Sequence, residues 1–265
     1  MGTACSGYES AQNVPSRVVA EKVSECLRFG GTSLSSNDKE IVAMDILAKL
    51  KSDPARKALI KHNFLEQMRN EPLGKEELSV ILGQWYHPLN YFPNFLGRLI
   101  SLCPLLEMKT TLSKILWQEL GEGKKERAHE EIFIKTMCDV GFTPQQFLES
   151  RPLEKTIELL NSFYHASDHH YLQGLGYIFG TEAADLAMVS SIGKAVARYA
   201  NIDKLPWVDI HITQEPDHQN SVDFALTSAL TEYEKEIVLK SARQAWEHWI
   251  NFFSGIEQEI YQTTG

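Results

Sequence analysis

The sequence shows almost no strand-like alternation of apolar and polar residues; its apolar residues recur at helical spacing over most of the chain. An N-cap at Asn37–Asp38, a proline after Asp53, and glycines or prolines between the apolar runs mark segment ends. We therefore expect an all-α bundle with helices longer than the usual ~11–12 residues. The expected helices cover about 38–51, 54 onward, 76–102, 105–121, 126–140, 144–149, 152–164, 168–180, 181–200, 206–228 and 232–261.

Length and charge limit the class of protein. With 265 residues, 43% of them hydrophobic, the chain can form one large globular domain. Residues 1–35 are small and polar and are expected to be poorly ordered, which leaves 36–265 as a single helical domain. The net charge of −9, with no basic cluster, argues against nucleic acid as a partner. No run approaches eighteen apolar residues, so no membrane span is expected.

Cysteine usage and the N-terminus bear on location. The four cysteines are scattered without a CxxC pair, as is typical of reduced thiols in a cytoplasmic protein. No apolar segment of a secretory signal is present. Residues Met1 to Ser6 match a myristoylation pattern that is short and often occurs by chance. We therefore expect a cytoplasmic protein and leave lipidation of Gly2 open.

One segment points to metal binding. His211, Glu215 and His218 stand at positions i, i+4 and i+7, within roughly 60° of one another on a helix. Imidazole and carboxylate ligands without a nearby cysteine suit iron or manganese better than structural zinc. Three ligands alone are a weak signal, and it gains strength if other long helices carry further Glu and His residues.

Two such residues stand on apolar helix faces. His129 shares its face with Phe133 and Met137, where a histidine that is simply hydrogen-bonded in the core is the competing interpretation. Glu182 begins an apolar stripe, and a role in stabilising the helix dipole competes there. A second cluster is short, polar and close to a helix junction, so we interpret it as a solvated connection; its members are His165, Asp168, His169 and His170.

Two assemblies of a dinuclear site fit these residues. The first is ferritin-like, with a Glu from each of two helices and an ExxH pair from each of two others. Its pairs would be Glu126/His129 and Glu215/His218, with Glu182 as the third carboxylate. The fourth carboxylate would come from one of the early glutamates Glu66, Glu71, Glu76 or Glu77. This assembly leaves His211 unused.

The second assembly rests on a family resemblance carried by several blocks between about residues 75 and 230. These blocks are Trp85-Tyr86-His87-Pro88, Phe92-Pro93-x-Phe95-Leu96, Glu119-Leu120-Gly121-Glu122-Gly123, Arg127-Ala128-His129-x-x-Ile132-Phe133, Cys138-x-x-Gly141-Phe142, Gly176-Tyr177-x-Phe179-Gly180-x-Glu182 and His211-x3-Glu215-x2-His218. In order and spacing they resemble the heme-oxygenase-like diiron oxidases and oxygenases, a family of iron-containing redox enzymes. The resemblance implies a heme-oxygenase-like helical bundle whose metal site lies between core helices. Matched one by one, the implied ligands are Glu119, His129, Glu182, His211, Glu215 and His218.

Glu215 stands where the family more often has Asp, which lengthens that ligand arm. Glu119 competes with Glu122, which would share the face of His129 on an unbroken helix. The two glycines around Glu122 each weaken a helix by about 1 kcal/mol, so we expect a turn there and favour Glu119.

The resemblance also implies a reaction. Two Fe(II) ions would react with dioxygen to oxidise a small organic substrate, and members of the family often act on an amino acid or a derivative in a biosynthetic pathway. Tyr86 and His87, beside the helix proline Pro88, are candidates for substrate binding, and Tyr86, Gln173 and Asp217 are candidates for hydrogen bonds to the ligands. An external electron donor and a homodimer are left open. The alternatives are the ferritin-like protein, a cofactor-free thiaminase-like protein and a non-catalytic protein on the same fold.

Overall fold

The computed structural model describes residues 46–168, 170–226 and 230–262, except for the side chains of Glu215, Phe224 and Ala225. These residues all belong to one compact unit, 39–265, and the part described contains helices and no strand. The N-terminal segment 1–35, for which we expect poor order, lies outside the described residues.

Residues 46–52 are helical and are followed by two short helices, α3 (Pro54–Ile60) and α4 (Asn63–Asn70). The longer elements are α5 (Lys75–Leu102), α6 (Leu106–Glu119), α9 (Glu154–Ala166), α10 (Tyr171–Ala200), α11 (Pro206–Leu226) and α12 (Glu232–Gln262). Between α6 and α9 lie the 3-10 helix η1 (Lys125–Arg127), α7 (His129–Asp139) and α8 (Pro144–Leu148). Most expected boundaries are confirmed within a few residues. The N-cap before Pro54 is confirmed too, since the Asp53 side chain accepts a hydrogen bond of 2.8 Å from the Ala55 amide.

Two expected boundaries are wrong. The expected helices 168–180 and 181–200 form one continuous helix, α10. Gly180 does not break it but allows close packing, because a Cβ there would lie 2.7 Å from the Ala245 Cβ of α12. The helix expected from 126 begins only at His129, because Glu126 belongs to η1. Helix α5 runs without a break through both Pro88 and Pro93, as the expected helix 76–102 requires.

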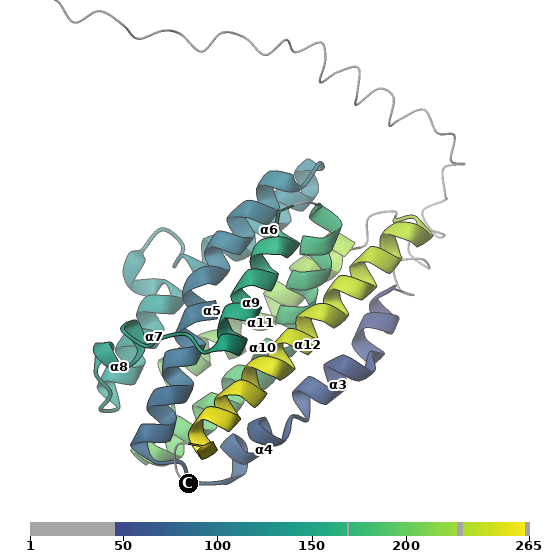
Figure 1. The fold of residues 1–265 in the computed structure, drawn as a ribbon. Coiled ribbons are helices and arrows are strands. Elements are labelled where there is room, and N and C mark those ends of the chain that lie inside the picture. Colours follow the sequence, from purple (N-terminus) through teal and green to yellow (C-terminus); the bar gives the residue numbers. More distant parts are fainter. Residues whose placement is uncertain (1–45, 169, 227–229, 263–265) are drawn as a thin grey trace, which may run out of the picture. The chain divides into compact units, whose positions relative to one another are not determined.

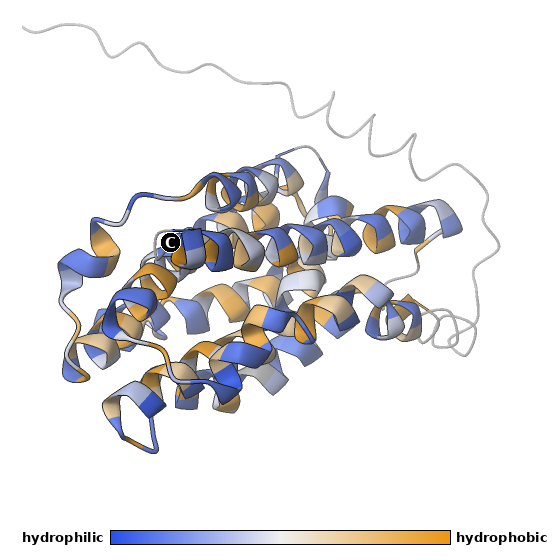
Figure 2. Cartoon of the chain, turned by 60° about the horizontal axis from the view of Figure 1, so that its bottom comes forward, coloured by the Kyte–Doolittle hydropathy of each residue, from blue (hydrophilic) through white to orange (hydrophobic). Residues whose placement is uncertain are grey.

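Helix α10 is the centre of the packing. It packs chiefly against α12 and α11, and also against α4 and α5 (Figure 1). Its contact with α12 is close at Gly176, where an added Cβ would lie 2.3 Å from the Val238 carbonyl oxygen. The helices carry hydrophobic and hydrophilic residues side by side along their length (Figure 2). Their buried apolar residues form one core, as expected of an amphipathic helical bundle.

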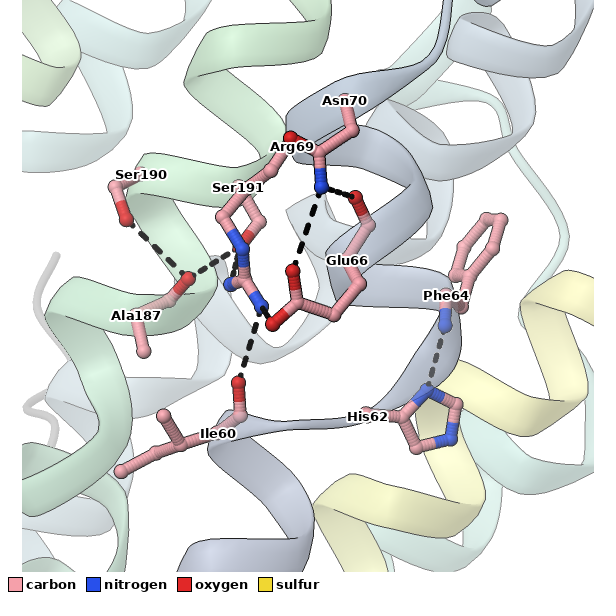
Figure 3. A network of polar contacts seen from close by, with 9 residues as sticks. All are labelled: Ile60, His62, Phe64, Glu66, Arg69, Asn70, Ala187, Ser190 and Ser191. Atoms are coloured by element: carbon pink, nitrogen blue, oxygen red, sulfur yellow. Dashed lines mark hydrogen bonds and ion pairs between the residues drawn. The ribbon is translucent and has the colours of Figure 1, made fainter.

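Polar contacts fix α4 against α10 (Figure 3). The Arg69 guanidinium donates to the Ser191 hydroxyl at 2.6 Å and to the Ile60 carbonyl at 3.2 Å, and it pairs with Glu66 at 2.7 Å. None of the described helices is both long enough and apolar enough to cross a membrane.

Candidate metal centre

A tight turn between α6 and α7 brings Glu119 and His129 together. Glu119 is the last residue of α6, and His129 is the first of α7. Gly121, Glu122 and Gly123 all have positive φ, of 78°, 55° and 82°. Gly121 has no room for a side chain, since a Cβ would lie 2.3 Å from the Lys124 carbonyl oxygen. The expected turn is therefore confirmed, and its glycines let the chain reverse directly after Glu119.

Four helices, α6, α7, α10 and α11, bring four of the predicted ligands into contact. The Glu119 carboxylate lies 3.0 Å from His129 Nδ1 and 3.8 Å from His218 Nδ1. His218 Nδ1 also lies 3.4 Å from the Glu182 carboxylate. All four side chains are buried, at 1–7% exposure, so charged and polar groups converge inside an otherwise apolar core.

His211 completes the imidazole set, and it lies beside a carboxylate that sequence reasoning missed. The ring centroids of His211 and His129 are 4.8 Å apart. His211 Nε2 lies 4.0 Å from an Asp185 carboxylate oxygen. Asp185 follows Glu182 by three residues and so shares its face of α10, and this i, i+3 spacing was the signal available in the sequence.

Two neighbouring groups fix the orientation of the imidazoles. His211 Nδ1 donates to the Trp207 carbonyl oxygen at 2.7 Å, which leaves Nε2 to carry the lone pair. His129 Nε2 lies 2.8 Å from Gln214 Oε1 and donates to it, so its Nδ1 faces Glu119. Such partners raise the basicity of metal-binding imidazoles and fix their orientation.

These partners differ from the three that the sequence suggested. The Asp217 carboxylate is exposed and pairs with Lys114 at 3.3 Å. Gln173 is exposed and lines a different cavity. The Tyr86 hydroxyl donates to the Glu130 carboxylate at 2.6 Å. The Trp207 contact lies within α11, four residues before His211, whereas the Gln214 contact depends on how α11 packs against α7, which the spacing of residues does not show.

Burial and neighbouring charge act in opposite directions on the pKa values of Glu119 and His129, and in the same direction on those of Asp185 and His211. Burial opposes ionisation of Glu119, but the adjacent His129 outweighs it and lowers the pKa of that carboxyl to about 2. Burial likewise opposes protonation of His129, and Glu119 raises its pKa to about 9. Burial, with the neighbouring Glu182 and Glu119, raises the pKa of Asp185 to about 8. Burial and the charge of His129 lower the pKa of His211 to about 4. The carboxylates therefore repel one another, and a cation would relieve that repulsion.

The cluster forms one end of an apolar pocket of about 40 Å³. Its polar wall holds Glu119, Glu182, Asp185, His211 and His218, and its other walls are Trp85, Pro88, Leu89, Phe92, Phe163, Thr181 and Trp249. Tyr86 and His87, the candidates for substrate binding, are not among these lining residues. Their chain neighbours Trp85 and Pro88 are, and Pro88 supports the expectation that the proline segment borders a pocket.

The remaining glutamates separate the two assemblies. Glu122 lies on the turn and pairs with Arg127 at 2.7 Å, as expected if Glu119 rather than Glu122 faces the cluster. Glu126 is exposed on η1, so the ExxH pair that the ferritin-like assembly needs does not reach the cluster. Glu215 lies on α11 between His211 and His218, but its side chain is outside the described residues, and its role stays a prediction.

The side chains of the cluster offer the kinds of nitrogen and oxygen donors that iron binds. Among the described residues, no three His, Cys, Asp or Glu side chains already stand in metal-coordinating geometry. However, His218 Nε2 and one Asp185 carboxylate oxygen are buried without a hydrogen-bond partner. Buried polar atoms rarely stay unpaired, and imidazole nitrogens with carboxylate oxygens are the donors that iron accepts. The residues present therefore fit iron ions.

The sequence profile of a family described as iron-containing redox enzymes matches residues 80–250, which is more than half of the chain. The chain belongs to this family. The match covers all six predicted ligand positions and Asp185 as well. The structure describes five of these six ligands in full, the exception being Glu215. A comparison with curated proteins found no match.

Solved structures share the fold of this family member. A CADD-like protein of unknown function from Nostoc punctiforme superposes with a TM-score of 0.69 at 13% identity, over 84% of this chain and 99% of that one. A domain of unknown function with a heme oxygenase-like fold from Shewanella denitrificans gives 0.66 at 15% identity, over 87% and 97%. A TenA homolog from Pseudomonas syringae gives 0.63 at 11% identity, over 86% and 98%. The expected heme-oxygenase-like, all-α fold is confirmed.

Proposed function

We propose that this family member binds two iron ions at the cluster and uses dioxygen to oxidise a small organic substrate. The proposed ligands are Glu119, His129, Glu182, His211, Glu215 and His218, and Asp185 is a further carboxylate within reach of His211. The observation that carries the proposal is the convergence of three imidazoles and three described carboxylates at one end of an apolar pocket. Iron bound there would supply the activation of dioxygen.

The protein's own residues would prepare the site. The Trp207 carbonyl holds His211 with Nε2 free to bind, and the Gln214 amide oxygen holds the His129 ring. Carboxylates offset the charge of two closely spaced cations, because unlike charges attract strongly where water is excluded. Since Asp185 has a raised pKa, it would lose a proton when a cation binds, and metal uptake should therefore release protons.

The pocket walls favour a substrate with an apolar portion. Trp85, Phe163 and Trp249 line the space beside the carboxylates and make that part of its wall apolar. We propose an amino acid or a derivative as substrate, oxidised at nitrogen or cleaved between carbons, in a biosynthetic pathway. This choice rests on the family resemblance of the sequence, whereas the walls support only an apolar portion next to a polar one.

Anaerobic loading with Fe(II) tests the proposal. Metal analysis should find close to two iron ions per chain, and admitting oxygen should then change the absorbance spectrum. His211→Ala should lower the iron content. His165→Ala is the matched control, because His165 is exposed and outside the cluster, and it should leave the iron content unchanged. Full occupancy in the His211 variant, or loss in the His165 variant, would refute this assignment.

A further inference from the structure

A second cavity, of about 470 Å³, lies between α3, α10 and α11. Its lining is largely apolar and consists of Ile60, Ala183, Leu186, Ala187 and Pro216, with Arg56, Glu182, Ser190 and Gln219 as the polar members. Glu182 lines both this cavity and the pocket of the candidate metal centre. We call it the Arg56 cavity.

Among the lining residues Arg56 is the cationic one and Glu182 the acidic one, and no ion pair joins Arg56 to an acid of the described residues. Its Nε donates to the Ala183 carbonyl at 3.0 Å, and Nη1 donates to the Lys51 carbonyl at 3.4 Å. Both partners are neutral backbone oxygens, and Nη2 has no hydrogen bond to any of the described residues. The side chain is half-buried, and burial lowers its pKa with no carboxylate acting in the opposite direction. A partly desolvated guanidinium that is not paired with a carboxylate favours an anion.

A neighbouring arginine, Arg69, differs from Arg56 because it is paired with an acid. Arg69 lies one helix further along, next to Ile60, Ala187 and Ser190 of the same region (Figure 3). Its guanidinium pairs with the Glu66 carboxylate at 2.7 Å and donates to Ser191. Arg69 is therefore neutralised within the protein, whereas Arg56 keeps its charge available at the wall of an open cavity.

The apolar walls of the Arg56 cavity favour an anion that carries a hydrocarbon chain. Leu186, which is 38% exposed, and Ile60, Ala187 and Pro216 offer an aliphatic surface next to the guanidinium. A planar carboxylate matches the fork of an arginine, and an attached hydrocarbon chain would cover the exposed leucine. Inorganic phosphate or a free metal ion would leave these apolar walls uncovered.

We propose that the Arg56 cavity is a second ligand site, which binds an aliphatic carboxylate with its head group on Arg56 and its chain along Ile60, Leu186 and Pro216. The site needs no iron, although it shares the Glu182 side chain with the pocket of the candidate metal centre. Because Pro216 belongs to the helix that carries His211 and His218, an occupant would also hold α11 against α10.

Calorimetric titration of octanoate into the metal-free protein tests the site. One molecule should bind per chain, whereas octylamine and inorganic phosphate should bind at least tenfold more weakly. Arg56→Gln should weaken octanoate at least tenfold, since a hydrogen bond to a charged group is worth about 1.5–3 kcal/mol. Lys57→Gln, on the next and exposed residue of α3, is the matched control and should leave the affinity unchanged.

Leu186→Trp keeps Arg56 and fills the apolar side of the cavity, so it tests the site even if Arg56→Gln loosens α3. It should abolish octanoate binding while the thermal unfolding temperature stays near that of the wild type. Octanoate bound equally well by both variants would place it in the pocket of the metal centre and overturn the proposal, as would no binding at all. Either result leaves the iron content, and so the proposed function, to be judged separately.

Discussion

Replacing Gly176 with alanine tests whether the close contact between α10 and α12 holds the bundle together. The new Cβ would lie 2.3 Å from the Val238 carbonyl oxygen, 2.8 Å from the Ser241 Cβ and 3.1 Å from the Ala242 nitrogen. Two of these three atoms are backbone, so no side-chain rotation relieves the overlap, and the two helices must separate. Overpacking of this kind costs about 1–3 kcal/mol, and the alanine regains about 1 kcal/mol through its higher helix propensity.

We therefore expect Gly176→Ala to lower the free energy of unfolding by about 1–2 kcal/mol, since the overlap with rigid backbone favours the upper part of the overpacking range. Gly97→Ala is the matched control, because Gly97 lies in α5 with no atom within 4 Å of the added Cβ. That variant should gain about 1 kcal/mol from helix propensity alone.

Denaturant unfolding followed by circular dichroism would measure both changes, and for a domain of this size each kcal/mol shifts the melting temperature by about 2–4 °C. A loss of stability for Gly176→Ala beside a gain for Gly97→Ala supports the reasoning. If both variants gained stability to the same extent, the close approach of α10 and α12 at this point would be refuted.

Three further predictions concern the candidate metal centre. Gln214→Leu should lower iron affinity about 10–100-fold in an anaerobic titration, because His129 loses the acceptor that orients it; unchanged affinity would contradict that role. In metal-free protein, the stabilisation from Glu119 is present above its unfolded pKa of 4.5 and is lost as pH falls through about 2. The stabilisation from His129 is present below its unfolded pKa of 6.5 and is lost as pH rises through about 9. The free energy of unfolding of the wild type should therefore be constant between pH 4.5 and pH 6.5, and Glu119→Gln should remove this plateau. Amide exchange over 206–220 should slow when Fe(II) binds, because Pro216 weakens that helix and the carboxylates around its histidines repel one another without metal; equal exchange with and without Fe(II) would show a preformed site.

The periodicity of the apolar residues was enough to predict an all-α bundle and most helix ends. This worked where local chemistry decides the outcome, as at Asp53 and Pro54, where a side-chain cap and a fixed φ start α3. It also worked at Gly121 to Gly123, where only a backbone tolerant of positive φ can make the turn after Glu119. Local signals failed at Gly180, where glycine serves a contact with α12 instead of ending a helix.

The residues of the candidate site could likewise be predicted only in part from the sequence. The family resemblance, which residue types and their order along the chain carry, was enough to select Glu119, His129, Glu182, His211 and His218, all of which the structure brings together. Spacing along one helix marks a shared face, so it can nominate donors, but it does not show which helix that face meets. The place of Asp185 and the Arg56 cavity depend on how α10 meets α11 and α3, and the Gln214 contact depends on how α11 meets α7. Only tertiary packing decided these features, because contacts between residues far apart in sequence leave no period in the sequence itself.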